Sequence, residues 1–284
     1  MKTPKTCIVV LNWNGARDTV ACLGSIFRAN DLSTVVLVVD NGSSDGSPDM
    51  ILEAFPGTEM LRLPSNLGYA AGNNAGFRRA EEMQAGYVVF LNNDTLVEGN
   101  FSLPLVDLLE NNTDAGIAVP KICYLGNPRK IWYAGGQVRL LTGLVRHVGI
   151  RREDGPEYCR PGTTDYATGC CIAMRCGDFR RAGGFDEGFG MYAEDVDLSL
   201  RVRAMGLNIR YVPSSKVLHR VSASLGGKRL KKLRRQSAGL FRLFLKHRAW
   251  SAFMLYPLLL PFRLAVSAFF HVDAKERVSG RESI

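Results

Sequence analysis

Two aspartates stand directly after short apolar runs, and both have amide side chains as neighbours. Asp40 follows Val35–Val39, and Asp94 closes a triplet whose first two residues are asparagines. A carboxylate at Asp40 can accept the imide N–H of uracil or thymine, or a ribose hydroxyl. A carboxylate at Asp94 can bind a divalent ion such as Mg²⁺, which takes most of its other ligands from phosphates. The structural alternatives are turn capping by Asp40 and capping of a helix from Glu98 by Asp94.

The densest acidic cluster is Glu194-Asp195-Val196-Asp197, which follows a glycine-rich stretch from Gly183 to Gly190. Flexible glycines before a helix can present a carboxylate into a cleft. An acidic first helical turn, favoured by the helix dipole, is the alternative and suits Asp197 best. His219 follows the last expected strand; taken alone, it is more typical of a hydrogen-bonded structural group than of a ligand.

The first ninety residues alternate between β-branched apolar runs and segments with helical spacing. Runs that are apolar at every position are typical of parallel strands covered on both faces. The pattern therefore predicts a parallel α/β sheet with right-handed crossovers. Strands are expected at 6–11, 35–39, 59–63 and 87–91, and helices at 17–28, with Val20, Leu23 and Phe27 on one face, at 47–54 and at 70–85.

Polar residues follow each of these four strands. Because ligands bind at the carboxyl ends of strands in open α/β sheets, we expect the polar groups to converge on one edge and form a binding site. The set is Asn12, Asn14, Asp40, Asn66, Gly68, Asn92, Asn93 and Asp94. A dinucleotide-binding site is excluded because the first turn reads NWNGARD, with one glycine instead of GxGxxG, and no GxxxxGK[ST] phosphate loop occurs.

After Asn100 the pattern of expected strands and helices is mixed, and no internal repeat occurs. Residues 124–161 are rich in Gly and Arg and are expected to form an excursion over one face. A domain boundary is expected near Val221, which divides the chain into 1–221 and a helical tail, 222–284. Helices are expected at 103–110 and 195–205, and strands at 116–120, 167–175, 208–212 and 216–219.

The charge of the chain is concentrated in the tail. Nine of the 36 Lys and Arg residues lie within 228–248, where no Asp or Glu occurs, so the other 27 balance the 27 acidic residues and the net charge is +9. Residues 249–270 are mostly apolar, but Arg263 near the middle would cost about 2.5–3.5 kcal/mol in a bilayer. This pattern predicts that the tail is an in-plane membrane anchor. The alternatives are that it packs on the protein body, spans the membrane or forms an oligomer contact. Nucleic-acid binding is disfavoured.

The seven cysteines form no CxxC pair, which predicts free thiols and a reducing compartment. The apolar run that starts at Cys7 is too short for the core of a signal peptide, so no export is expected.

Together these segments resemble family 2 glycosyltransferases, which have the GT-A fold, an α/β fold with a mixed, mostly parallel central sheet. The resemblance covers about residues 6–220, and within the family it is nearest to the rhamnosyltransferase branch, through NLGYAAGNN together with NND. The matching segments, in order, are VVLNWNG, VVDNGSSDGS, NLGYAAGNNAGF, YVVFLNNDT, GGFDEGFGMYAEDVDLSLR and VPSSKVLH.

The resemblance implies a role for each matched residue. Asn12 and Asp40 would contact the nucleoside of the donor. Asp94 would bind the metal, Mg²⁺ or Mn²⁺, with His219 completing its ligands. Asp195 would be the catalytic base and Glu194 would orient the acceptor. Asn66, Gly68 and Asn73 would line the nucleotide. Asn93 shares the metal motif with Asp94, and Asn14 and Asn93 are further substrate-binding positions.

The implied activity is inverting transfer of one sugar from a nucleoside-diphosphate sugar, with TDP-rhamnose as a candidate donor, to a glycan or polyprenyl-diphosphate-linked acceptor in cell-envelope polysaccharide synthesis. The implied location is cytoplasmic, peripheral on the inner face of the membrane, and the chain is open to being a homo-oligomer. The metal motif departs from Asp-x-Asp by starting with asparagine, and the QxxRW signature of processive synthases is absent.

Two alternatives are a nucleotidyltransferase and a non-catalytic sugar-nucleotide-binding protein. Deleting 222–284 is expected to release the enzyme from membranes and to spare activity on a soluble acceptor.

Overall fold

The N-terminal half alternates strands and helices, as the sequence predicts. The structure is a computed structural model. It describes residues 6–28, 34–189, 192–221 and 229–258, and for residues 229–232 it describes the backbone alone. The strands of this half are β1 (Thr6–Asn12), β2 (Thr34–Asp40), β3 (Glu59–Arg62) and β4 (Tyr87–Asn92). The helices between them are α1 (Ala16–Arg28), α2 (Ser47–Ala54) and α3 (Gly68–Glu82).

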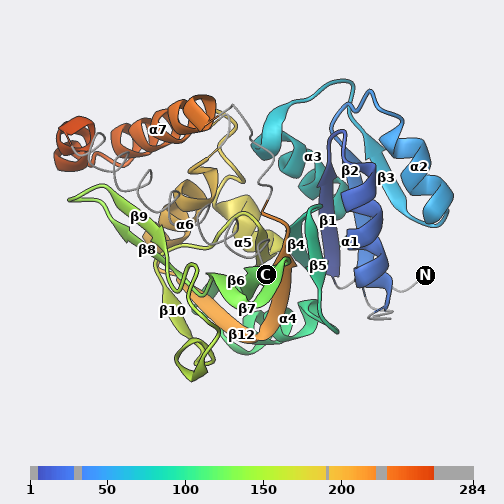
Figure 1. Cartoon of the computed structure of the whole chain (residues 1–284), viewed down its shortest axis with the longest axis horizontal. Helices are drawn as coiled ribbons and strands as arrows, with labels where there is room; N and C mark the ends of the chain where they lie inside the picture. Colours follow the sequence, from blue (N-terminus) through green and yellow to red (C-terminus); the bar gives the residue numbers. More distant parts are fainter. Residues whose placement is uncertain (1–5, 29–33, 190–191, 222–228, 259–284) are drawn as a thin grey trace, which may run out of the picture.

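These four strands are all parallel and form one side of a large mixed sheet, in the order β3-β2-β1-β4 (Figure 1). The register pairs Asn12 with Asp40, and Leu11 with Asn92. The predicted polar residues therefore leave the sheet at one level, which is the first condition for a shared site.

The C-terminal half extends the sheet with strands of both directions. Strand β11 runs antiparallel to β4 and β6, and β12 lies beyond β6 and is parallel to it. The start of β11 thus meets the end of β4, where Asp94 follows. The elements are β5 (Thr95–Val97), α4 (Ser102–Asn111), β6 (Ala115–Tyr124), β7 (Asn127–Tyr133), β8 (Gly136–Arg139), β9 (Leu144–His147), η1 (Pro156–Tyr158), β10 (Gly162–Thr164), β11 (Cys171–Arg175), α5 (Cys176–Arg181), α6 (Glu194–Ala204) and β12 (Asn208–His219).

Several boundaries differ from the sequence-based expectation. The two short strands expected at 208–212 and 216–219 are one strand, β12, with a register shift between Val212 and Lys216, where Pro213 interrupts the pattern. The strand expected from 167 begins only at Cys171. Asp94 is followed by β5, and α4 begins at Ser102, so Asp94 caps no helix. Strands β5 and β10 are three residues each, too short to show a periodic pattern.

The apolar face predicted for α1 is also partly wrong. Leu23 is buried, but Phe27 is 43% exposed and lies against the ring of Phe55, with centroids 5.1 Å apart. The buried side of α1 is made of smaller residues, because the helix packs closely on the sheet edge and β5: Ala16, Thr19, Cys22, Leu23, Ser25 and Ile26.

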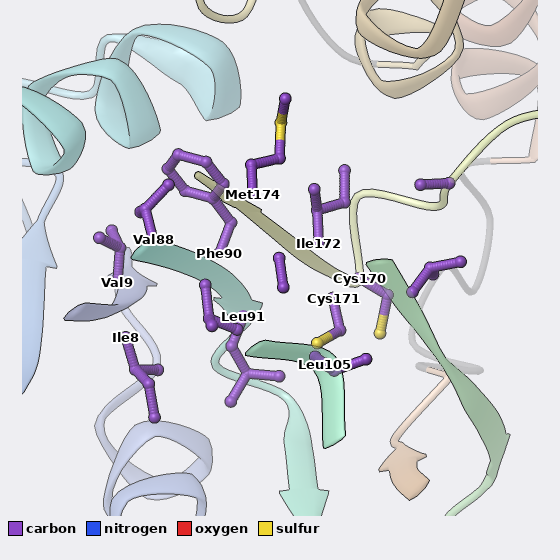
Figure 2. Packing of buried hydrophobic residues seen from close by; sticks show 14 of the residues in the cluster. Ile8, Val9, Val88, Phe90, Leu91, Leu105, Cys170, Cys171, Ile172 and Met174 are labelled. Carbon is purple, nitrogen blue, oxygen red and sulfur yellow. The ribbon is translucent and has the colours of Figure 1, made fainter. Parts of the chain in front are cut away.

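The main core lies between the sheet and the helices on its faces (Figure 2). Phe90 of β4 is fully buried, and its ring lies 4.8 Å from that of Phe179 in α5 and 5.1 Å from that of Phe185. Removing a buried ring of this kind costs about 3–5 kcal/mol. Because Phe185 begins the segment that leads to Glu194, this core also anchors the acidic cluster.

The basic tail forms helix α7 (Arg229–Lys246), which lies over α6 and beside the β8–β9 hairpin (Figure 1). Some of its apolar side chains, and some of those in the following helical residues, 250–258, belong to a second core cluster. That cluster joins Leu243, Phe244, Ala249, Ala252 and Tyr256 of the tail to Tyr166, Phe189, Ala193 and Val196 of the body. The described part of the tail therefore packs on the body, which the sequence left open as an alternative to a membrane anchor.

Among the described residues, no helix is long and apolar enough to span a membrane. The apolar stretch 249–270 is described only as far as residue 258, and the rest of it lies outside the described residues. The predicted division at Val221 stays a prediction.

Candidate active site

The carboxylate of Asp40 is held by three hydrogen bonds at the end of β2. Its Oδ1 accepts from Asn12 Nδ2 at 2.8 Å and from the Ser43 hydroxyl at 2.6 Å, and its Oδ2 accepts from the Ser43 backbone N–H at 3.1 Å. Asn12 is fully buried and Asp40 is 3% exposed. Asn12 therefore lies behind Asp40 and sets the position of its carboxylate.

The turn after Asp40 is locked against the loop that precedes α3. Gly42 has φ of +70°, and a Cβ there would lie 2.4 Å from Ser65 Cα, so only glycine fits. The amide of Asn41 donates to Asn66 Oδ1 and to the Gly68 carbonyl, both at 3.1 Å, and accepts from Leu67 N–H at 2.9 Å. Asn66 and Gly68 thus lie beside Asn41, the residue after Asp40, and their role toward a nucleotide stays a prediction.

A chain of hydrogen bonds links the Asp40 site to the end of β4. Asn93 Nδ2 donates to the Thr19 hydroxyl at 2.9 Å, and that hydroxyl donates to Asn12 Oδ1 at 2.8 Å. Asn12 in turn donates to Asp40. Three strand ends and α1 are therefore tied into one rigid polar edge.

Two of the predicted substrate-binding residues, Asn14 and Asn73, form hydrogen bonds within the protein. The exposed Asn14 accepts from Ser44 N–H at 2.9 Å and has φ of +49°, so it shapes the turn before α1. Asn73 is 2% exposed, and its amide donates to the Tyr69 carbonyl inside α3. Their roles toward a nucleotide stay predictions.

Asp94 and His219 face each other at the end of the β5–β12 pair. Strand pairing sets His219 opposite Thr95, and the Asp94 carbonyl accepts from Arg220 N–H at 2.8 Å. His219 Nε2 lies 3.3 Å from Asp94 Oδ1. Oδ1 of Asp94 and Nδ1 of His219 are both buried, and neither has a hydrogen-bond partner among the described residues.

This pair fits a divalent metal ion. A carboxylate oxygen with no hydrogen bond and an imidazole at short distance are two suitable ligands, and buried polar atoms without partners are rare unless a ligand satisfies them. Within the described ranges, no group of three or more His, Cys, Asp and Glu side chains gathers. The protein would thus supply two ligands, and donor phosphates and water the others.

Asp195 lies in the first turn of α6 and points to the loop before β11. Its Oδ2 accepts from Gly169 N–H at 2.9 Å, and its Oδ1 from Val196 N–H at 2.8 Å. Gly169 precedes Cys170, whose carbonyl accepts from Asn92 N–H at 3.0 Å. These bonds connect Asp195 to the same sheet edge as Asp40 and Asp94.

The neighbouring Glu194 is buried, and its Oε2 has no hydrogen-bond partner among the described residues. Burial, and then the charge of Asp195, raise the pKa of Glu194 to about 8. Burial also raises the pKa of Asp195 above its usual value, although the backbone N–H groups of Gly169, Val196 and Asp195 itself oppose the shift. A pair of carboxyls with raised pKa values in one place is typical of a site that exchanges protons.

Tyr69 of α3 completes this part of the site and was missed from the sequence. Its hydroxyl donates to the Gly169 carbonyl at 2.6 Å, and a Cβ on Gly169 would lie 2.9 Å from that hydroxyl and 3.6 Å from Asp195 Cβ. The tyrosine therefore lies close to the acidic pair. Tyr69 falls inside the NLGYAAGNN motif, but nothing in that motif indicates which residue faces α6.

An aromatic wall from the 124–161 excursion borders the metal pair. The Trp132 ring lies edge-on to both His219 and His147, with centroids 4.5 Å apart in each case. Tyr133 donates to the Tyr166 carbonyl. The excursion was expected to lie over one face, but these aromatic contacts depend on tertiary packing and have no local sequence signal.

Hydrogen bonds and strand pairing thus bring Asp40, the Asp94–His219 pair and Asp195 to one edge of a mixed α/β sheet. The family model described as "Glycosyl transferase family 2" matches residues 7–183, more than half of the 284-residue chain. The chain belongs to this family and is a glycosyltransferase.

Two curated relatives extend the comparison. An N-acetylglucosaminyl-diphospho-decaprenol L-rhamnosyltransferase of Mycobacterium tuberculosis is 30% identical over 242 residues, which cover 77% of this chain and 77% of the relative. The rhamnosyltransferase WbbL of Escherichia coli K12 is 24% identical over 229 residues, which cover 74% of this chain and 82% of the relative.

Solved structures agree on the fold. A mannosyltransferase from Pyrobaculum calidifontis, in complex with GDP-Man and Mn²⁺, superposes with a TM-score of 0.61 at 17% identity, over 97% of this chain and 81% of that one. GalNAc-T7 with UDP, GalNAc and Mn²⁺ gives a TM-score of 0.62 at 18% identity over 77% of this chain, which spans only 44% of that protein.

Proposed function

We propose that this chain is an inverting, metal-dependent glycosyltransferase that moves one sugar from a nucleoside-diphosphate donor to a membrane-borne acceptor. One observation carries the proposal: hydrogen bonds tie the surroundings of Asp40, Asp94 and Asp195 to a single sheet edge. A nucleotidyltransferase would need a basic glycine-rich loop to hold a triphosphate, and a mere binding protein would need no Asp195.

The donor nucleoside lies against the β1–β2 edge. Asp40 accepts a hydrogen bond from the base or ribose, and Asn12 and Ser43 keep its carboxylate in place. Preorganisation of this kind lowers the ordering cost of binding. Asp94 and His219 would hold the metal, which when bound neutralises charge on the leaving diphosphate.

The acceptor hydroxyl is deprotonated by Asp195 as its oxygen attacks the anomeric carbon. The nucleoside diphosphate leaves from the opposite face, so the configuration inverts. Base assistance is typically worth about 10²–10⁴-fold. Glu194, whose pKa burial raises to about 8, keeps its proton near neutral pH and orients the acceptor as a hydrogen-bond donor.

The donor sugar proposed is L-rhamnose, carried on TDP, and the acceptor is linked to a polyprenyl diphosphate. Two relatives from different bacteria support the sugar, since both are described as rhamnosyltransferases. The decaprenol in the name of the M. tuberculosis relative supports the lipid carrier. The absence of a QxxRW segment favours addition of a single sugar.

An exposed apolar corner supports docking at the cytoplasmic face of a membrane. Trp250, Met254 and Leu258 recur every four residues, and are 59%, 70% and 74% exposed. The tip of the β8–β9 hairpin packs on the same helical segment, because a Cβ on Gly143 would lie 3.4 Å from Ala252, and Leu141, two residues before Gly143, is 77% exposed. The adjoining basic helix α7 suits anionic lipid headgroups.

A panel of UDP-, TDP- and GDP-sugars, with mass detection of the product, tests the function. The expected result is transfer of one deoxyhexose from TDP-rhamnose to a polyprenyl-diphosphate acceptor. Transfer of a nucleotidyl group, or donor binding with no transfer, would reject the proposal.

Sedimentation with anionic vesicles tests the membrane face separately. The Trp250→Asp and Met254→Glu double variant is expected to stay in the supernatant, and the wild-type chain and Leu103→Glu, a change at an exposed leucine on α4, to sediment. Equal sedimentation of all three proteins would contradict the docking face.

A further inference from the structure

The backbone that presents the acidic pair is in a rarely adopted conformation. Tyr192 and Ala193, the two residues before α6, have φ of +78° and +74°. Neither is glycine, and left-handed backbone in two successive side-chain-bearing residues persists only where the surroundings enforce it. Such conformations gather at functional sites, so the question is which contacts hold this turn.

Helix α7 of the tail lies directly on the turn. A Cβ on Gly239 would lie 2.3 Å from the Tyr192 carbonyl oxygen and 3.6 Å from Ala193 Cβ. Only a residue without a side chain allows this approach. Ala193 also packs in the second core cluster with Leu243 and Phe244 of α7.

The end of α7 holds α6 itself through Asp197, which is fully buried two residues after Asp195. Lys246 Nζ lies 2.9 Å from the Asp197 carboxylate and His247 Nε2 lies 2.8 Å from it, and Arg201 of α6 donates to it at 2.8 Å. Burial alone would raise the pKa of Asp197, but these bonds lower it below its usual value. The anion is thus satisfied partly by the tail.

The segment before the turn is held in the same way. Asp186 lies 2.6 Å from Lys246 Nζ and 3.3 Å from Arg242 Nη2. Both cations also lie over the Phe189 ring, at 5.6 and 5.1 Å from its centroid. Three sets of contacts, made by α7 and by His247 just after it, therefore converge on residues that flank Glu194 and Asp195.

We propose that α7 is a positioning element for the catalytic pair: Gly239, Lys246 and His247 hold the strained turn and α6 so that Asp195 faces the acceptor. This inference rests on the proposed function for the role of Asp195. It also changes the expectation for the tail, because removing it would take away contacts that the site requires and would not spare activity.

Gly239→Ala in the full-length chain tests this clamp, by which we mean the contacts of Gly239, Lys246 and His247 with the turn and α6. The change raises helix propensity, so α7 itself does not weaken, but the added methyl must displace the turn. The expected result is a fall in kcat of about 10²-fold, the cost of a misplacement of about 1 Å, with KM for the donor within about 2-fold. Gly177→Ala is the matched control, since a Cβ there meets nothing within 4 Å.

A second pair of variants keeps the test independent of one substitution. His247→Ala removes a donor to buried Asp197 and is expected to lower kcat, and His247→Gln, whose amide can donate from a similar place, is expected to restore most of it. Full activity of both Gly239→Ala and His247→Ala would overturn the inference. So would a loss in His247→Gln equal to that in His247→Ala.

Amide hydrogen exchange separates this inference from the proposed function. Residues 192–199 are expected to exchange faster in Gly239→Ala and His247→Ala than in the wild type, with β1 and β2 unchanged. Unchanged exchange at 192–199 would refute the clamp whatever the chain transfers. Absence of any sugar transfer by the wild-type chain would refute the proposed function and leave the exchange result standing.

Discussion

The two acidic parts of the site are built in opposite ways. At the β1–β2 edge, Asp40 accepts hydrogen bonds from Asn12 at the end of β1 and from Ser43 in the turn after β2, and Gly42 locks that turn. At the start of α6, Glu194 has a raised pKa and a buried oxygen with no hydrogen-bond partner in the part of the chain that the structure describes, and the preceding turn is strained.

On the proposed roles, the difference separates binding from chemistry. A carboxylate that recognises a nucleoside is best held rigid with one acceptor position left for the ligand, because its charge does not change. A group that moves a proton needs an environment that destabilises its charged form, which burial supplies. The distant helix α7 then holds that unfavourable arrangement in place.

The largest expected effect is that of Asp195→Asn. The change keeps the shape of the side chain but removes the base, so kcat is expected to fall about 10²–10⁴-fold with little change in donor KM. Initial rates of product formation measure it, with Asp49→Asn on α2 as an exposed control. A fall below about 10-fold would contradict the assignment of Asp195 as the base.

Asp94→Ala should have the next largest effect. Loss of the carboxylate removes one of two protein ligands, and Lewis-acid stabilisation of several kcal/mol corresponds to about 10²-fold in rate. A chelator should suppress the wild-type enzyme, and Mn²⁺ should restore it at concentrations that leave Asp94→Ala inactive. Undiminished turnover by Asp94→Ala and by the chelator-treated wild type would show that turnover does not depend on a metal.

Ser43→Ala tests the rigid side of the comparison. It removes the 2.6 Å hydrogen bond to Asp40, and a bond to a charged group contributes about 1.5–3 kcal/mol, so donor KM is expected to rise about 10-fold or more with kcat nearly unchanged. Ser44→Ala is the matched control, because its hydroxyl makes no hydrogen bond within the described part of the chain. A loss in kcat with unchanged KM would place Asp40 in the chemistry.

The smallest effect concerns pH and stability. Because the pKa of Glu194 is raised from 4.5 to about 8, its contribution to stability is complete below the unfolded value and is lost as the pH rises through the folded one. Between about pH 6 and pH 9, the Tm of the wild type should therefore fall more than the Tm of Glu194→Gln. The two falls should differ by at least about 2 °C. Parallel Tm curves would show that Glu194 titrates normally.

Much of the donor side could be predicted because its signals are local. Strands β1 to β4 are apolar runs, and the residues after them lie at one edge wherever parallel strands are in register. Asp94 and His219 also meet as expected, although the pairing of β5 with β12 that joins them was not foreseen. A three-residue strand carries too little pattern to be recognised.

The other half of the site depends on contacts between residues far apart in the chain. The bond between Tyr69 and Gly169 spans 100 residues, and that between His247 and Asp197 spans 50. The basic and apolar tail was interpreted as a membrane anchor, but its described part packs on the body through Leu243 and Phe244. Amphipathic spacing indicates that a helix has an apolar face and does not indicate what covers it.

The alternation of strands and helices in the N-terminal half, the carboxylates after the strands and the family are thus properties of the amino-acid sequence, because apolar periodicity and strand-end residues are local features. The strained turn before α6, the raised pKa of Glu194 and the clamp by α7 arise only in the tertiary structure. Burial and strain are relations between distant segments, so they exist only after the chain has packed.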